Sequence, residues 1–293
     1  MRSKLFVPGV RPELFAKALA GDADALSFDL EDSVPVEAKD MARGAVVQCL
    51  RSEAARVSGK ILIVRSNALD SAHGEADLLS LAGTGVDMVN LPKVERVDEV
   101  LAAVALLERA ESMQGVGQPI RLLLTIETPC GLRRAAQLAS AHPRVAGLQL
   151  GLADLFEPLG IDRRDPANLH AALFELRVAA GMAGVFACDG AFADLRDDAA
   201  FRVEALMARR LGYIGKSCIH PRQVPLANDV FRASADEIAR ARRIVEAADR
   251  AAAEGRAAFV VDGQMIDPPF VKRAQAMLAS VRETDGGSNK PLS

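Results

Sequence analysis

Short apolar runs recur eight times along the chain, and each ends at a charged or glycine-flanked polar cluster. The runs are residues 4–7, 26–28, 61–64, 88–91, 122–126, 145–150, 185–187 and 213–214. Enough residues separate successive runs for a loop and a helix. A strand followed by a helix, repeated eight times, predicts a TIM (β/α)8 barrel, an α/β fold. Because barrel chemistry lies at the C-terminal ends of the strands, the pattern also locates the site.

The segments between the runs have helical periodicity, and the chain continues after the eighth run. Residues 96–113 and 235–253 are amphipathic, the second preceded by Ser234 as a predicted N-cap. We predict a catalytic barrel domain over 1–230 and a C-terminal helical extension over 231–283, acting as a packing arm or a lid. The polar, Gly- and Ser-rich residues 284–293 are predicted to be a disordered tail.

Composition excludes several functional classes. A net charge of −3, no Trp and one Tyr argue against a nucleic-acid surface. The longest apolar run, residues 100–107, is too short to span a membrane, and no secretory signal precedes the first strand. The four cysteines form no C-x-x-C pair, which is typical of reduced thiols. We therefore expect a soluble cytoplasmic protein with no nucleic-acid or membrane partner.

Glu127 and Asp154 each follow an apolar run, and the two runs are consecutive. Both carboxylates should therefore lie at the same rim of the barrel. Hard oxygen ligands without a neighbouring His or Cys suit Mg²⁺, which keeps much of its shell as water and substrate oxygens. The alternative is that these acids cap helices or pair with basic residues at the rim.

The second and third runs end in a further charged group. Arg65 has a guanidinium fork suited to a carboxylate or a developing enolate oxygen, or alternatively it forms a structural ion pair with Asp29 or Glu31. Asp29 and Glu31 are candidates for a general base, for holding metal-bound waters, or for orienting basic residues. Asp32 is expected to cap a helix.

Lys93 and Lys216 also follow predicted strands. A lysine at a strand end forms a Schiff base when burial lowers its pKa. Among so many acids, however, basic residues more often balance charge, and we favour that interpretation for both lysines.

Seven motifs together resemble the citrate lyase β-subunit family, within the wider HpcH/HpaI aldolase and malyl-CoA lyase superfamily. They are RSKLFVPG (2–9), FDLEDSV (28–34), VRSN (64–67), LPK (91–93), IETP (126–129), GLADL (151–155) and GKSCIHPRQ (215–223). The resemblance covers residues 2 to about 280. It implies a TIM barrel, Mg²⁺ dependence, and cleavage or formation of a C–C bond in a β-hydroxyacyl thioester. Typical substrates are citryl-, malyl-, methylmalyl- or citramalyl-CoA, which give acetyl- or propionyl-CoA and a 2-oxo acid.

By motif, the resemblance makes Glu127 and Asp154 metal ligands, and Arg65 and Glu127 substrate contacts. It also likens residues 265–267 to a C-terminal segment whose aspartate, here Asp267, closes over the site of a neighbouring subunit. This implies a homotrimer or hexamer in which Asp267 protonates the enolate carbon or abstracts its proton.

The charges imply a mechanism in which a base removes the β-hydroxyl proton as the C–C bond breaks. Asp29, Glu31 or a metal-held hydroxide are the candidate bases, and Arg65 would stabilise the thioester enolate. Two other functions stay open at this stage. One is a class II aldolase that acts on free hydroxy-keto acids, and the other is an acyl-carrier-dependent subunit of a citrate lyase complex.

Overall fold

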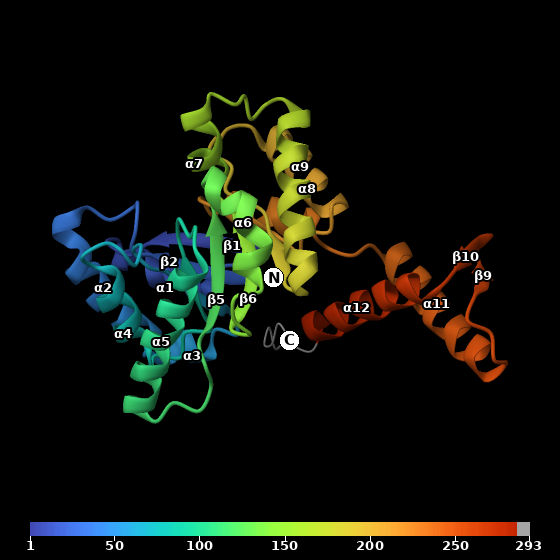
Figure 1. Cartoon of the computed structure of the whole chain (residues 1–293), viewed down its shortest axis with the longest axis horizontal. Coiled ribbons are helices and arrows are strands. Elements are labelled where there is room, and N and C mark those ends of the chain that lie inside the picture. The colour runs from blue at the N-terminus through green and yellow to red at the C-terminus, as the bar shows by residue number, and fades with distance from the viewer. Residues whose placement is uncertain (286–293) are drawn as a thin grey trace. The chain divides into compact units, whose positions relative to one another are not determined.

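The computed structural model describes residues 1–285 and contains an eight-stranded parallel barrel (Figure 1). Its strands are β1 (Ser3–Pro8), β2 (Ala25–Asp29), β3 (Ile61–Arg65), β4 (Met88–Leu91), β5 (Arg121–Ile126), β6 (Val145–Leu150), β7 (Phe186–Cys188) and β8 (Lys216–Cys218). Neighbouring strands pair in order from β1 to β7, and β1 also pairs with β8. Strands β7 and β8 are joined by an isolated bridge between Asp189 and Lys216, so the barrel is nearly closed. The predicted TIM-barrel fold is confirmed.

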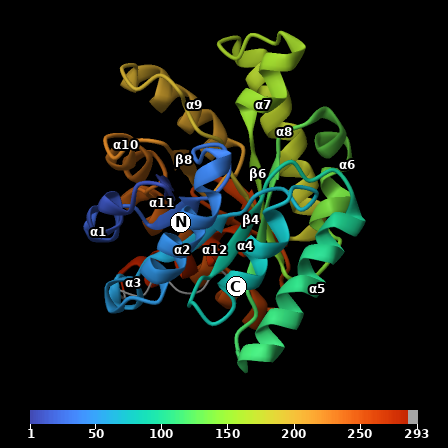
Figure 2. The ribbon, with the colours of Figure 1, turned by 90° about the vertical axis from the view of Figure 1, so that its left-hand side faces the viewer.

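Helices surround the strands, as Figure 2 shows. They are α1 (Phe15–Ala20), α2 (Lys39–Leu50), α3 (Glu53–Val57), α4 (Gly74–Leu81), α5 (Val97–Gln114), α6 (Pro129–Ala139), α7 (Leu152–Phe156), α8 (Pro166–Ala183), α9 (Asp198–Arg210) and α10 (Gln223–Val230), with short 3₁₀ turns η1 (Pro12–Leu14), η2 (Val36–Ala38) and η3 (Glu157–Leu159). None of the helices within residues 1–285 is long and apolar enough to cross a membrane.

The eighth strand differs from its prediction. The apolar pair Tyr213 and Ile214 was expected to form it, but the strand is Lys216–Cys218. Tyr213 is buried, and its hydroxyl donates to the carbonyl of Leu173 at 2.9 Å. Packing against α8, rather than strand pairing, therefore explains this apolar residue.

Successive side chains of a strand point alternately outward to the helices and inward to the barrel, so the structure has an outer core and a separate interior. Residues such as Leu5 and Val7 of β1 belong to the large apolar core shared with the helices. A separate small cluster, which includes Ile63, Met88 and Leu123, fills part of the interior. Other inward-facing residues, such as Thr125 and Gln149, are polar.

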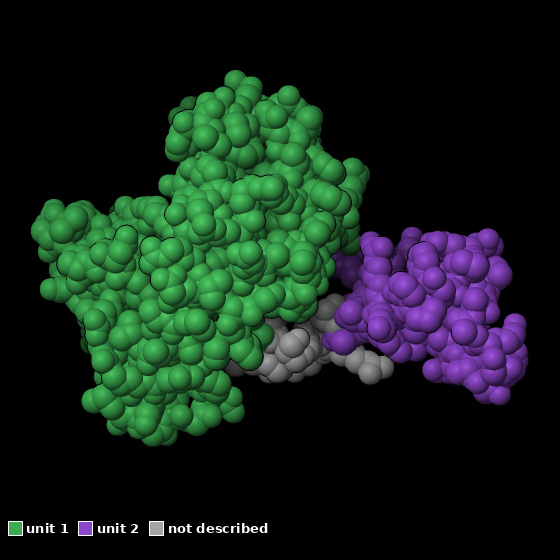
Figure 3. All heavy atoms as spheres, viewed as in Figure 1, with its two compact units in different colours: residues 1–231, 292–293 green, residues 232–291 purple. Residues whose placement is uncertain are grey.

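Among the described residues, 232–285 form a second compact unit, distinguished by colour in Figure 3. Its elements are α11 (Ala235–Ala253), β9 (Phe259–Val261), β10 (Gln264–Ile266) and α12 (Pro268–Asp285). Ser234 caps α11 by accepting from the backbone of Glu237 at 3.1 Å, as predicted. Helix α12 includes the first two residues of the predicted tail over 284–293, and the others lie outside the described residues.

Candidate functional site

A cavity of about 400 Å³ lies at the C-terminal ends of the barrel strands. Four of the predicted site residues line it: Asp29, Arg65, Glu127 and Asp154. They come from β2, β3, the end of β5 and the first turn of α7. Residues that are far apart in the sequence thus meet because parallel strands present their carboxyl ends at one rim.

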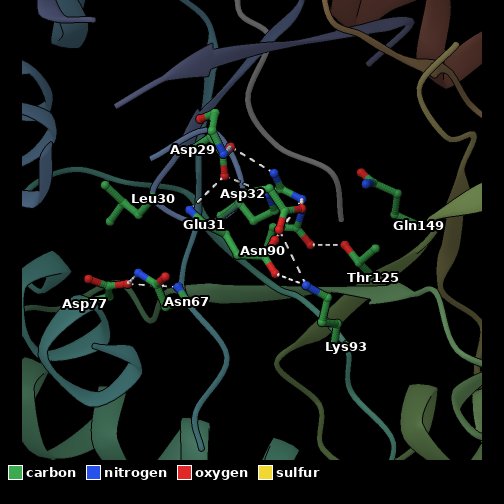
Figure 4. Close-up of polar contacts among 12 residues, drawn as sticks. Asp29, Leu30, Glu31, Asp32, Asn67, Asp77, Asn90, Lys93, Thr125 and Gln149 are labelled. Atoms are coloured by element: carbon green, nitrogen blue, oxygen red, sulfur yellow. Dashed lines mark hydrogen bonds and ion pairs between the residues drawn. The ribbon is translucent and has the colours of Figure 1, made fainter. Parts of the chain in front are cut away.

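Arg65 is the centre of the charged network at this rim, which Figure 4 shows with its acidic partners labelled. Its Nε and Nη2 atoms donate to the two carboxylate oxygens of Asp29 at 2.7 and 2.8 Å, a bidentate pair. Its Nη1 lies 2.8 Å from Glu31 and 3.2 Å from Asp32. The guanidinium also lies over the ring of Phe6, 5.1 Å from the centroid. The ion pairs to Asp29 and Glu31 therefore exist, and they hold Arg65 at the cavity wall.

Asp29 and Glu31 have opposite pKa shifts. Burial alone would raise the pKa of Asp29, but Arg65 and the backbone N–H groups of Glu31 and Ser33 together lower it. Burial raises the pKa of Glu31 more than Arg65 and Lys93 lower it. Asp29 is thus an orienting partner of Arg65 and a poor proton acceptor, whereas Glu31 is the better base of the two.

Asp32 does not cap a helix, so that prediction is wrong. The next helical elements begin at Val36 and Lys39, and their N-cap residues are Pro35 and Ala38. Asp32 instead turns toward the charged rim, where its carboxylate contacts Arg65. Asp32 is close to a helix in the sequence, but its ion pair with Arg65 determines where its side chain points.

Lys93 reaches the site through both its backbone and its side chain. It has a φ of 52°, in the left-handed region that non-glycine residues rarely adopt. This conformation lets its N–H donate to Oε1 of Glu127 at 2.8 Å, while its Nζ donates to Glu31 at 2.7 Å. Burial by itself would lower the pKa of Lys93, but the pairing with Glu31 raises it. The backbone role of Lys93 has no signal in the sequence.

Glu127 is almost fully buried, with 2% of its surface exposed. Burial, followed by repulsion from Glu31 and Asp154, raises its pKa to about 7. Gly151 packs directly against it, since a Cβ on that glycine would lie 2.4 Å from the Cβ and 2.5 Å from Oε2 of Glu127. A glycine is therefore required beside this carboxylate.

The donor set fits a divalent cation. The carboxylates around the cavity belong to Asp29, Glu31, Asp32, Glu127 and Asp154, and the cationic side chains are Arg65 and Lys93. The resulting excess of negative charge is what a bound Mg²⁺ would offset. No group of three His, Cys, Asp or Glu residues within 1–285 is close enough to hold a metal alone. Mg²⁺ commonly uses one or two carboxylates and completes its shell with water and substrate, so Glu127 and the exposed Asp154 suffice.

Lys216 does not reach the cavity. Its fully buried Nζ is 2.6 Å from both Asp189 and Glu204 and also donates to the carbonyl of Gly190 at 3.0 Å. Burial opposes the charge, but these two carboxylates raise the pKa of Lys216. An ammonium group held in this way is not a nucleophile, which agrees with the charge-balance interpretation.

Thr125 and Gln149 line the cavity floor and were not predicted. They are register partners on β5 and β6, and both are buried. The sequence did contain a signal for them, because a polar residue within an otherwise apolar strand is unusual. Their inward direction follows only from the strand register.

Asp267 lies in the second unit, directly before α12. Its Oδ1 is buried and has no hydrogen-bond partner among the described residues. The first two helical residues, Pro268 and Pro269, have no N–H to offer it. Helix capping therefore does not account for this oxygen.

Comparison with known proteins gives consistent matches. The family described as HpcH/HpaI aldolase/citrate lyase matches residues 2–221. The citrate lyase subunit beta of Escherichia coli (strain K12) is 38% identical over 281 residues, which cover 95% of this chain and 92% of that protein. The L-malyl-CoA/beta-methylmalyl-CoA lyase of Cereibacter sphaeroides (strain ATCC 17029) is 33% identical over 298 residues, covering 94% of this chain and 93% of that one.

A solved structure is similar over nearly the whole chain. It is the protein CitE from Mycobacterium tuberculosis in complex with magnesium, acetoacetate and coenzyme A. The TM-score is 0.74 at 32% identity, and the alignment covers 97% of this chain and 100% of the other. The similarity therefore extends past the barrel into the second unit.

Proposed function

Because the chain belongs to the HpcH/HpaI aldolase/citrate lyase family, a group of carbon–carbon lyases, we propose that it is a Mg²⁺-dependent lyase acting on a β-hydroxyacyl-CoA thioester. Citryl-, malyl-, methylmalyl- and citramalyl-CoA are the candidate substrates, and the products are acetyl- or propionyl-CoA and a 2-oxo acid. The observation that carries the proposal is the convergence of Glu127, Asp154 and Arg65 on one cavity.

Glu127 and Asp154 are the residues that would hold Mg²⁺. When bound, the ion would polarise the substrate oxygens that it coordinates and make the β-hydroxyl proton easier to remove. The backbone N–H of Lys93 orients Glu127 by occupying Oε1. Oε2 faces the space that Gly151 leaves open, so Glu127 has an oxygen available for binding.

Arg65 supplies the positive charge for the thioester enolate. Its bidentate pair with Asp29 fixes the guanidinium before the substrate arrives, so no reorganisation is needed as charge develops. Removing a contact of this kind typically costs roughly 3–4 kcal/mol of transition-state stabilisation. Of the two acidic candidates for the base, we favour Glu31, because its pKa is raised and that of Asp29 is lowered.

A second cavity supports a thioester substrate over a free hydroxy-keto acid. It has a volume of about 630 Å³ and is lined mainly by apolar residues of β1, α1 and residues 219–225. Phe6, Pro8 and Ile219 line both this cavity and the catalytic one. The CoA portion of a thioester could therefore extend from the catalytic cavity into this second cavity along β1. A free hydroxy-keto acid is too short to occupy both cavities.

We further propose that residues 231–283 act as the lid and that Asp267 completes the site of an adjacent protomer, in a trimer or hexamer. Its buried Oδ1, which has no partner among residues 1–285, supports a role outside its own unit. Complementation tests this idea. Mixing inactive Arg65→Ala and Asp267→Ala protomers should restore part of the activity. Mixed oligomers with no activity would show that Asp267 does not complete a neighbouring site.

The decisive experiment for the reaction is a condensation screen. Acetyl- and propionyl-CoA are each incubated with glyoxylate, pyruvate or oxaloacetate and Mg²⁺, with Glu127→Gln as the matched inactive control. We expect one pair to form a hydroxyacyl-CoA product. Cleavage of free hydroxy-keto acids without CoA would instead identify an aldolase. Turnover only with an acyl carrier protein would identify a subunit of a larger complex.

A further inference from the structure

Behind Gln149 of the cavity floor, the barrel interior contains a buried lysine that is not part of the charged rim. Lys4 enters the barrel interior from β1 and has 0% of its surface exposed. Its Nζ donates to Oε1 of Gln149 and lies 4.3 Å from the ring centroid of Phe6. Within residues 1–285 no carboxylate is within ion-pair distance of this ammonium. Lys4 therefore differs from Lys216, which two carboxylates neutralise.

This contact fixes the orientation of the Gln149 amide. A lysine ammonium has hydrogen-bond donors and no acceptor, so it can face only the carbonyl oxygen of Gln149. The hydroxyl of Ser217 also points to that oxygen, at 3.3 Å. The amide NH₂ must then lie at the opposite end. It makes no hydrogen bond within the described part of the chain, and Gln149 lines the cavity.

A second unused donor belongs to Asn90, which does not line the cavity. Asn90 is fully buried, and its Oδ1 accepts from the hydroxyl of Thr125 at 2.7 Å. Its Nδ2 has no partner among the described residues. Figure 4 shows Gln149 beside the Thr125–Asn90 pair. The floor thus offers the cavity one unused donor, the Gln149 amide NH₂, and the buried Lys4 ammonium lies behind it, whereas the rim is acidic.

We propose that Gln149 is a specificity-determining residue whose amide NH₂ donates to a second carboxylate on the acid half of the substrate, with Lys4 as the positioning residue that orients it. The inference rests on the proposed lyase function, in which the first carboxylate belongs to the metal site. A substrate with an apolar group at this place would leave the Gln149 NH₂ unpaired. A dicarboxylic acid half is therefore preferred.

Binding of malate and lactate tests the preference, because these stable 2-hydroxy acids differ by one carboxylate. Each is titrated with Mg²⁺ into the full-length protein by calorimetry. We expect wild type to prefer malate and Gln149→Leu to bind malate roughly tenfold or more weakly, with lactate binding unchanged. Gln118→Leu, the same change at an exposed position, should behave as wild type.

Lys4→Met tests the positioning role. It should weaken malate selectively while leaving lactate unchanged, since it releases the Gln149 amide without touching the ligand. If Lys4→Met does not fold, the malate and lactate affinities of Gln149→Leu alone decide whether Gln149 determines the specificity. Equal loss of malate and lactate binding in Gln149→Leu, or a wild type that does not distinguish them, overturns the inference. The condensation screen is scored separately. If the protein is a lyase but Gln149→Leu keeps the wild-type preference for malate, only the role of Gln149 is refuted. If malate is preferred but no lyase activity is found, only the proposed reaction is refuted.

Discussion

Replacing Lys4 should stabilise the barrel at neutral pH and change how its stability depends on pH. Burial, with a further contribution from Arg65, lowers the pKa of the Lys4 ammonium from 10.5 to about 8. In the unfolded chain the group keeps its ordinary pKa. Between pH 8 and 10.5 the unfolded state therefore binds more protons than the folded state, and wild-type stability rises with pH. Below pH 8 the folded protein bears the full cost of the buried charge.

The size of this effect follows from the displaced pKa. A shift from 10.5 to about 8 corresponds to about 3 kcal/mol of destabilisation at pH 7. Methionine is unbranched and apolar, and it can fill the space beside Phe6. Lys4→Met also loses the hydrogen bond to Gln149, worth about 1 kcal/mol. The variant should therefore be more stable than wild type by about 2 kcal/mol at pH 7.

Urea denaturation between pH 7 and 9.5 measures the difference. The chain has one tyrosine, Tyr213, which is buried in the barrel unit, and no tryptophan. Tyrosine fluorescence consequently reports on the barrel rather than on the second unit. The stability advantage of Lys4→Met should shrink as pH rises above 8, while Lys17→Met, at an exposed position, shows no such trend. An advantage that is constant with pH, or a less stable variant at pH 7, would refute the reasoning.

Three further outcomes follow from the site. Glu127→Gln or Asp154→Asn should abolish Mg²⁺ binding measured by calorimetry, with circular dichroism unchanged. Unaltered affinity in both variants would contradict the metal assignment. Gly151→Ala should weaken Mg²⁺ binding roughly 10–100-fold, because the new Cβ would lie 2.4 Å from Cβ of Glu127. A variant that binds as wild type does would show that Glu127 need not stay in place. Borohydride added with a keto acid should trap no adduct, and a mass shift at Lys93 or Lys216 would establish an imine instead.

The sequence by itself determined the barrel and the residues at its rim. Seven strands were predicted within a residue or two because each is an apolar run between polar segments, a local pattern. Arg65 and Glu127 were identified as site residues for the same reason, since each follows such a run directly. In a parallel barrel these ends converge, so local position in the chain is enough to bring the residues to one rim.

The tertiary structure alone decided which way the remaining polar residues face. Strand β8 begins with Lys216 and Ser217 and is not an apolar run, so hydrophobicity gave no signal for it, and pairing with β1 defines it. Register places Lys216 against α9, away from the cavity. Lys4 meets Gln149 across 145 positions of sequence, because closing the ring brings the first strand across from the sixth. Such contacts depend on strand register and barrel closure, and neither is encoded in the residues next to them.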